Sequence, residues 1–465
     1  MIITFCCLAA LATASAETIV LKSGRRIVVD SVEERDGRVQ YTIGDNTMTI
    51  PKSIVDHIEA GGVPASPVTQ SRRDDPPPPV VNEQLPARAE LVARVIHNDQ
   101  VDTSALRAIE NEGSAEDAAT AYAVAAGFAE RHNDLESAGR YLERALKFLP
   151  NRALLLENYA SLLLQLGRTA EALSAAERAT RANPQSAAAY ALLGYACYKH
   201  DRSRDAIAAW KRSLALVPDP RVQQLLDRAE REANTEADFR QQESNHFTLR
   251  YEGGQAPEAL RTQILDTLES DYRDLSSDLG AAPKNIFVSL YTDQAFFDVT
   301  QAPAWTSALN DGKIRIPISG LTSITPELAR VLRHELTHSF VQNITHGRAP
   351  QWLNEGIAQL EEGMSTSAFG PRLASLYVSG RQVPLSQLEG NFGGFGSGEA
   401  QVAYAEGLAA TEYIRATYGM SDVARILQRI GEGQSVEAAL RSTIHSGYAE
   451  LEGEITGYLK KTYGA

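Results

Sequence analysis

Cysteine is scarce in this chain of 465 residues, with three in total, at Cys6, Cys7 and Cys197. The first two fall in a stretch that we expect to be removed, so the remaining chain cannot form an internal disulfide. Cys197 lies between Ala196 and Tyr198 on a predicted helix, a setting that favours burial over reactivity. A fold held together by disulfides is therefore excluded.

Positive charge is also in short supply, because 45 lysines and arginines stand against 59 aspartates and glutamates, which gives a formal net charge of −14. A chain of this sign repels phosphate backbones and offers no polybasic patch to an anionic membrane surface. Long apolar runs are missing as well, since no later segment approaches the roughly 20 apolar residues that cross a bilayer. We expect no nucleic-acid partner and no transmembrane anchor after signal cleavage.

The first sixteen residues, 1–16, contain no charged side chain and end in Ala-Thr-Ala-Ser-Ala before Glu17. An apolar stretch followed by small residues is typical of a signal peptide, and we predict cleavage after Ala16. The basic segment that usually begins a signal peptide is missing. A membrane anchor is the alternative, but sixteen residues fall short of the roughly 20 that a span needs. The predicted location of the mature protein is periplasmic or secreted.

The remaining length exceeds that of a usual single domain and predicts a multidomain protein. Residues 17–60 contain short β-type runs separated by glycine-containing turns, which predicts a small all-β N-terminal module. Its predicted strands are Ile19–Leu21, Ile27–Val29, Val39–Ile43 and Thr47–Ile50. Residues 61–86, with four consecutive prolines at 76–79, predict an extended and semi-rigid linker.

Residues 87–240 carry an internal repeat of 34 residues. Pro150, Pro184 and Pro218 keep that spacing, and small residues recur in register before them. Small residues where two helices cross, with proline after the second helix, are typical of tetratricopeptide repeats. We predict an all-α tetratricopeptide solenoid with three full repeats over 118–219, a degenerate helix pair before them and a capping helix after them. Such arrays bind peptides or proteins, although the array could instead only brace the domain that follows.

A His-Glu-Leu-Thr-His motif that begins at residue 334 is the most informative feature of the chain. A helix turns about 100° per residue, so His334 and His338 lie on one face with both imidazoles directed at one point. Zinc binds imidazole nitrogen and carboxylate oxygen, and a catalytic site takes three protein ligands and leaves a fourth position to water. Glu355 is the natural third ligand. Glu335 is rotated off the metal axis, where it can reach a bound water as general base.

The residues around this motif predict the helix that carries it. Thr325 can cap the helix, Pro326 suits its first turn, and Gly347 follows its far end. An apolar row recurs every four residues and faces away from the histidines. The row consists of Leu328, Leu332, Leu336 and Phe340. Sixteen residues separate His338 from Glu355, which is enough for a turn and a second helix that carries the glutamate.

These segments resemble a known family. The sequences HELTH and QWLNEGIAQ are similar to those of the gluzincin branch of the zincin metallopeptidases, and most of all to the bacterial peptidase MA-like group. The resemblance covers about half of the chain and implies an α+β zincin-like (gluzincin) peptidase domain over residues 241–465. It also implies that Zn2+ is bound by His334, His338 and Glu355. Glu335 is then the catalytic base and proton shuttle.

The resemblance assigns further roles outside the two motifs. Gluzincins bind the substrate backbone along an edge strand, a role that falls here to Gly312–Pro317, whose alternation of apolar and basic residues fits a half-exposed strand. Thermolysin-like enzymes orient a histidine with an aspartate four residues after the ligand glutamate. This chain has Gln359 there, which implies a less tightly held metal. Tyr404 is the candidate for steadying the oxyanion, with Tyr413 behind it, and a packing role is the alternative.

The sequence therefore predicts a secreted or periplasmic zinc-dependent metallopeptidase. It would hydrolyse peptide bonds through a zinc-activated water, with Glu335 as general base. The tetratricopeptide repeats would recruit a peptide or protein substrate, or another protein partner. One alternative is a non-enzymatic envelope interaction or scaffold protein with a vestigial zinc site. Another is a zinc hydrolase of a non-peptide amide.

Overall fold

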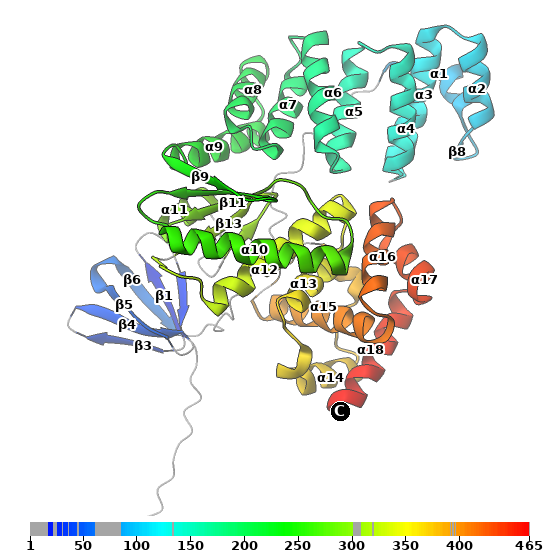
Figure 1. Ribbon diagram of the computed structural model, residues 1–465. Coiled ribbons are helices and arrows are strands. Elements are labelled where there is room, and N and C mark those ends of the chain that lie inside the picture. Colours follow the sequence, from blue (N-terminus) through cyan, green and yellow to red (C-terminus); the bar gives the residue numbers. More distant parts are fainter. Residues whose placement is uncertain are drawn as a thin grey trace, which may run out of the picture.

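A computed structural model describes most of the chain (Figure 1). The described residues are 17–21, 26–29, 31–35, 37–43, 46–60, 85–132, 134–300, 308–318, 320–390, 392, 395 and 397–464. The predicted signal peptide at 1–16 lies outside them, and so does most of the predicted linker, 61–84. None of the described helices is long and apolar enough to span a bilayer.

The N-terminal module is all-β, as predicted. Its described strands form two three-stranded antiparallel sheets with the orders β2-β1-β6 and β3-β4-β5 (Figure 1). The strands are β1 (Glu17–Leu21), β2 (Arg26–Val29), β3 (Ser31–Arg35), β4 (Arg38–Ile43), β5 (Asn46–Pro51) and β6 (Val55–Ala60). β3 and β6 were not predicted, because β3 ends in three charged residues and β6 alternates apolar with charged or polar residues near the linker. Pairing with a neighbouring strand overrides such weak propensity.

The predicted solenoid is present as stacked helix pairs, drawn from cyan to green in Figure 1. The three full repeats are α3 (Ala115–Arg131) with α4 (Leu135–Phe148), α5 (Ala153–Gln165) with α6 (Thr169–Ala182), and α7 (Ala187–Lys199) with α8 (Ser203–Leu216). The degenerate pair before them consists of α1 (Ala89–Val95) and α2 (Thr103–Glu112), which a small hairpin of β7 (Ile96–His97) and β8 (Gln100–Val101) connects. The capping helix is α9 (Pro220–Thr235).

Small residues hold each helix pair together, as the repeat pattern predicts. Ala138, Ala172 and Ala206 occupy equivalent positions and are fully buried. Gly194 has the same function within the last pair, because a side chain there would overlap the ring of Trp210. Each repeat therefore packs through positions where only a small side chain fits.

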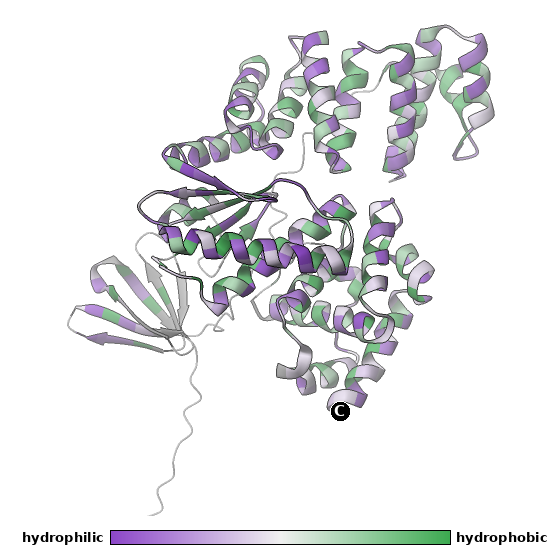
Figure 2. Ribbon diagram, in the orientation of Figure 1, coloured by the Kyte–Doolittle hydropathy of each residue, from purple (hydrophilic) through white to green (hydrophobic). Residues whose placement is uncertain are grey.

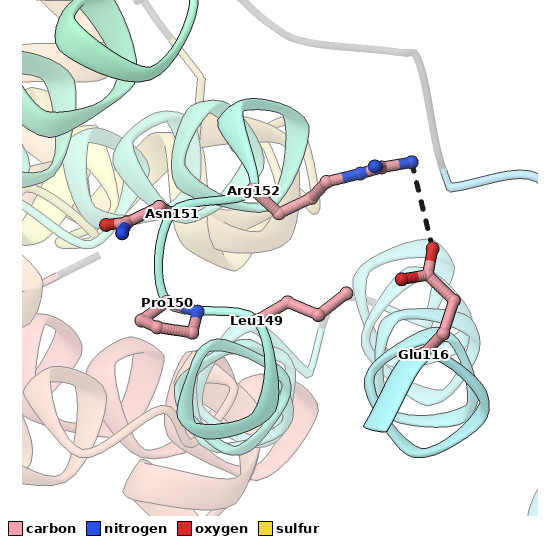
Figure 3. Close-up of a pocket in the computed structure, with 5 residues that line it drawn as sticks. All are labelled: Glu116, Leu149, Pro150, Asn151 and Arg152. Carbon is pink, nitrogen blue, oxygen red and sulfur yellow. Dashed lines mark ion pairs between the residues drawn. The ribbon is translucent and has the colours of Figure 1, made fainter. Parts of the chain in front are cut away.

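An open pocket of about 250 Å³ lies where the first repeat meets the second (Figure 3). Its lining residues are Glu116, Leu149, Pro150, Asn151 and Arg152. Glu116 and Arg152 face each other across it, with 3.8 Å between the carboxylate and the guanidinium group. The pocket belongs to the repeat domain and contains none of the predicted metal ligands.

The C-terminal domain begins with a mixed sheet. In the part of the chain that the structure describes, the strand order is β12-β13-β11-β10-β9, with the three inner strands parallel and the two outer strands antiparallel. The strands are β9 (Phe239–Glu243), β10 (Phe247–Glu252), β11 (Ile286–Tyr291), β12 (Leu309–Asn310) and β13 (Ile314–Pro317). The predicted domain boundary at residue 240 falls within β9.

Two layers of helices follow the sheet. The helices are α10 (Glu258–Leu279), α11 (Asp293–Thr300), α12 (Pro326–Thr345), α13 (Gln351–Glu361), α14 (Gly370–Val378), α15 (Ser397–Tyr418), α16 (Met420–Gly431), α17 (Val436–Ile444) and α18 (Tyr448–Tyr463), with short 3-10 turns at Thr366–Ala368 and Leu385–Leu388. One hydrophobic core joins the sheet, α10, α12 and the C-terminal helices. Figure 2 shows helices coloured in alternating apolar and polar bands, as amphipathic helices around a shared core require.

The prediction that residues 312–317 form an exposed edge strand is wrong. β13 pairs with β11 on one side and with β12 on the other, so β12 is the edge of the sheet. Lys313 and Arg315, expected on a half-exposed face, are 6% and 0% exposed. The physical reason is that both side chains pair with carboxylates of the repeat domain, which lie far away in the sequence.

These ion pairs form a buried cluster between the two domains. Glu232 of α9 binds Lys313 at 2.7 Å and Arg315 at 3.1 Å. Asp311 pairs with Arg315 and with Arg228 of α9. Burial alone would raise the pKa of Glu232, but Arg315 and Lys313 outweigh burial and lower its pKa to about 2. Charges that are buried and matched in this way fix one orientation of the repeats on the sheet.

The repeats contact the C-terminal domain at the turn between the two helices of each pair. Glu136, at the start of α4, pairs with Arg348 at 3.6 Å. Gly167 lies against His346, since a Cβ added at the glycine would come within 3.2 Å of the histidine backbone. Asp201 binds Lys313 at 2.6 Å and also pairs with Arg250. Gly167 and Asp201 are one repeat apart, so the solenoid uses the same edge in successive repeats.

Removing the carboxylate of Glu232 should destabilise the protein strongly. Glu232→Ala leaves two buried cations without this partner, which we expect to cost about 3–5 kcal/mol of unfolding free energy. The matched control is Glu230→Ala on the same helix, because Glu230 forms an exposed pair with Lys211 that should matter little. Denaturant unfolding measures both variants. An equal loss in the two would show that the cluster contributes no more than a surface pair.

Candidate functional site

Helix α12 positions the two histidines. As predicted, it begins after Thr325, whose side chain accepts a hydrogen bond from the backbone N–H of Leu328, and Pro326 occupies its first turn. The helix ends at His346, which adopts a left-handed conformation before Gly347. The predicted apolar row is buried in the core of the domain. This packing fixes the rotation of α12 about its axis, and with it the direction of the histidines.

Helix α13 brings Glu355 to the same point. Its Oε2 atom lies 3.6 Å from Nε2 of His334 and 3.8 Å from Nε2 of His338. All three side chains are buried, and their ligand atoms lie within 4.8 Å of one another. The structure therefore brings together the three residues that the sequence predicts as metal ligands.

The donor atoms fit a metal ion. The Nε2 atoms of His334 and His338 are buried and have no hydrogen-bond partner among the described residues, a costly arrangement unless a cation binds them. Ligands about 2.1 Å from a tetrahedral zinc are about 3.4 Å apart, slightly less than the distances from the two Nε2 atoms to Glu355 Oε2. Two imidazoles and one carboxylate match the donor set of a catalytic zinc site.

Hydrogen bonds orient each ligand. His334 Nδ1 lies 3.1 Å from Glu362 Oε1, and His338 Nδ1 lies 3.1 Å from Asn354 Oδ1. In both rings Nδ1–H donates, which leaves the Nε2 lone pair for a metal. The Nε2 amide of Gln351 donates to Glu355 Oε1 at 2.8 Å. Each ligand thus has a partner that sets its orientation.

Gln359 does not take the place of the aspartate that orients a histidine in thermolysin-like enzymes. Its side-chain amide donates instead to the backbone carbonyl of Tyr404 at 3.2 Å. Glu362, seven residues after Glu355, contacts His334 in its place and supplies a negative charge. Two helical turns separate these two glutamates, so they share a face of the helix. That spacing is the signal by which the sequence could have identified Glu362.

Charge and burial set the protonation of the histidines. Burial lowers the pKa of His338 to about 4. Burial also acts to lower the pKa of His334, but the neighbouring carboxylates of Glu355 and Glu362 outweigh burial and raise the pKa to about 10. Because only a neutral ring offers a lone pair, a metal ion must displace the proton of His334 when it binds.

Glu335 is placed as a proton carrier rather than as a ligand. Neither of its carboxyl oxygens has a hydrogen-bond partner among the described residues, and the residue is fully buried. Burial raises the pKa of Glu335 to about 8. The positive charge of His334 opposes this shift, and the negative charges of Glu355 and Glu362 add to it. A carboxyl group that titrates near neutral pH can both accept and donate a proton.

Tyr404 lies on α15, close to the acidic side chains of the site. Burial raises the pKa of its phenol well above the ordinary value, and the charges of Glu355 and Glu335 add to the shift. Its ring meets Phe392 edge-on, with 5.3 Å between the ring centroids. The phenol therefore stays protonated and can only donate a proton to a negative oxygen. Tyr413, the second candidate, donates a hydrogen bond to Glu454 of α18 at 3.2 Å.

Two glycines allow α13 and α15 to pack closely. A Cβ at Gly356 would overlap the Thr411 hydroxyl and the Gly407 carbonyl, and a Cβ at Gly407 would lie 2.6 Å from the carbonyl of Trp352. Gly356 directly follows Glu355, so this contact fixes the backbone beside the third ligand. Sequence analysis recognised Gly356 only as part of the motif and did not predict its contact with α15.

Enlarging Gly356 should displace the third ligand. We expect Gly356→Ala to lower the unfolding free energy by about 1–3 kcal/mol, because the added methyl group overpacks the α13–α15 contact. It should also weaken metal binding. Gly457→Ala on α18 is the control, since a Cβ there meets nothing within 4 Å. Thermal unfolding and metal titration measure both variants, and unchanged metal binding in Gly356→Ala would contradict the role of this contact.

Removing the charge of Glu362 should weaken the metal site. Glu362→Gln is expected to lower metal affinity about 10- to 100-fold, because the ring of His334 becomes a poorer ligand. Competition with a chromophoric chelator measures the affinity. Exposed Glu432 provides the control variant, Glu432→Gln. Equal affinities in the two variants would leave Glu362 without a role at the site.

Comparison with protein families agrees with this architecture. Residues 273–460 match the Peptidase MA superfamily, and residues 163–229 match a tetratricopeptide repeat family. No curated protein matches the chain. The first match contains both helices that carry the ligands, and the second contains α6, α7 and α8. The C-terminal part of the chain is therefore a Peptidase MA superfamily domain, and a tetratricopeptide repeat domain precedes it.

Proposed function

We propose that this protein is a zinc-dependent metallopeptidase of the gluzincin type. The observation that carries the proposal is the convergence of two buried imidazole nitrogens on the carboxylate of Glu355. Neither nitrogen has a hydrogen-bond partner among the described residues. The Peptidase MA superfamily match supports a peptidase-type enzyme. The choice of zinc follows from the donor set of two nitrogens and one oxygen.

The residues around the ligands have defined roles in this proposal. A zinc ion held by His334, His338 and Glu355 would lower the pKa of a water molecule towards about 7 and would polarise a carbonyl oxygen. Glu335 accepts the proton of the attacking water and then donates it to the leaving amine. Tyr404 donates a hydrogen bond to the oxyanion. Glu362 and Asn354 hold the two imidazoles in the tautomer that binds a metal.

The substrate backbone would lie along β12 rather than β13. β12 forms the edge of the sheet beside β13, and Asn310 on it contacts α12 through the carbonyl of Glu335. An extended peptide can add to such an edge by backbone hydrogen bonds. Peptide or protein substrates fit this arrangement better than compact small molecules.

We also propose export and recruitment. The segment at residues 1–16 would direct the chain to the periplasm or the outside of the cell. The repeats would recruit the substrate or a further protein, as repeat arrays commonly do.

The decisive experiment compares the wild type with Glu335→Gln. The wild type should bind about one zinc ion and cleave a denatured protein until a chelator is added. Glu335→Gln should keep the metal and lose about 10²–10⁴-fold in rate, because general base catalysis contributes that much. Glu327→Gln, an exposed change in the first turn of α12, should behave as the wild type does. Undiminished cleavage by Glu335→Gln would remove this residue from the mechanism.

The same assay separates the alternatives. A scaffold with a vestigial site would bind zinc and hydrolyse nothing. A hydrolase of non-peptide amides would cleave acylated small molecules or cell-wall fragments, remain sensitive to the chelator and leave the denatured protein intact.

A further inference from the structure

A short turn at residues 310–313 lies between the repeat domain and helix α12. It connects β12 to β13, and we refer to it as the interdomain turn. Residues of α7 and α9 contact it from one side, and α12 contacts it from the other. No feature of the two metal-binding motifs points to this turn.

Asn310 connects the turn to the catalytic helix. Its side-chain Nδ2 donates to the backbone carbonyl of Glu335 and to the Ser339 hydroxyl, both at 2.7 Å. Its Oδ1 accepts a hydrogen bond from the backbone N–H of Gly312 at 3.0 Å. A carbonyl can only accept and a backbone N–H can only donate, so these partners fix the orientation of the amide. Asn310 is 6% exposed, which makes these bonds costly to lose.

The repeat domain holds the other side of the turn. The Nζ atom of Lys199, the last residue of α7, donates to the backbone carbonyl of Asp311 at 3.0 Å. The side chain of Asp311 pairs with Arg228 of α9 and with Arg315 of β13. Asp311 directly follows Asn310, so a displacement of α7 or α9 acts on the asparagine through a single peptide unit.

We propose that the interdomain turn is a positioning element through which the repeat domain holds Glu335 in place, with Asn310 as the positioning residue. The inference rests on the proposed function, because it assigns a route by which the repeats support hydrolysis. In the described part of the chain, no hydrogen bond fixes the carboxylate of Glu335. Contacts with the backbone of Glu335, such as the hydrogen bond from Asn310, are therefore what can fix the position of this residue.

The first test is Asn310→Asp in the full chain. The new carboxylate can still accept the hydrogen bond from the backbone N–H of Gly312. Its second oxygen replaces the NH2 group that donates to the carbonyl of Glu335, so two acceptors face each other there. We expect kcat to fall about 10- to 100-fold, because small misplacements of a catalytic group cost that much. KM should change much less than kcat, because the Asn310 side chain contacts α12, whereas a substrate on β12 would pair with the strand backbone. Zinc content should remain that of the wild type.

The matched control is Asn183→Asp. Asn183 forms a similar local turn at the end of α6, where its Oδ1 accepts from the backbone N–H of Gln185 at 3.1 Å, but it lies in the repeat domain away from α12. Its kcat should stay within about twofold of the wild type. An unchanged kcat in Asn310→Asp overturns the proposal. The proposal is also overturned if a loss of zinc or of folded protein accounts for the whole loss of activity.

A second pair of variants tests the contact with the repeats. Lys199→Met removes the ammonium group that holds the Asp311 carbonyl and should lower kcat severalfold with little change in KM. Lys211→Met on α8 removes an exposed ion pair with Glu230 and should leave kcat unchanged. Equal kcat values for the two variants would show that the repeats do not act through this turn.

A readout that does not depend on activity separates this proposal from the proposed function. Amide hydrogen exchange of residues 335–339 should be faster in Asn310→Ala than in the wild type, and unchanged in Asn183→Ala. If the wild type cleaves no substrate, the proposed function fails, and the exchange rates still decide whether the turn holds α12. Equal exchange in all three proteins would refute the positioning role.

Discussion

The burial of the polar atoms of two histidines and a glutamate at one point is the constraint on which the site depends. The Nε2 atoms of His334 and His338 are excluded from water, and Glu355 presents an oxygen to both. Such atoms cost free energy in the folded chain, so the surrounding structure must compensate for them. It does so through the core around α12 and through the close approach of α13 to α15 at Gly356 and Gly407. A local motif is thereby held by contacts from the whole domain.

The sequence was sufficient wherever local periodicity decides the structure. The spacing of His334 and His338, the cap at Thr325 and the 34-residue repeat are all properties of single helices or helix pairs, and the structure agrees with each of them. Glu355 was also found, because its helix follows directly along the chain. Glu362 was not predicted although its seven-residue spacing from Glu355 is visible, because thermolysin-like enzymes use the position four residues after the ligand glutamate.

What the sequence did not reveal depends on contacts between distant segments. Lys313 and Arg315 alternate with apolar residues, a pattern that indicates an exposed face when the strand is considered alone. Their burial requires Glu232, about eighty positions earlier, and no periodicity connects the two segments. The edge strand β12 is two residues long, which is too short for any pattern to identify. The burial of Lys313 and Arg315 and the formation of β12 both depend on tertiary contacts, which a local sequence pattern does not show.

The docked edge of the solenoid bears on what the repeats do. Bracing and recruitment were alternatives at the level of sequence, and the structure shows contacts with the C-terminal domain along one edge of the array. The turns within the helix pairs carry Gly167, Asp201 and neighbouring Glu136, and they are occupied by the C-terminal domain. A partner must therefore bind elsewhere on the array. Because Asp201 pairs with Lys313 and Arg228 of α9 pairs with Asp311, these contacts connect the repeats directly to the strands beside α12.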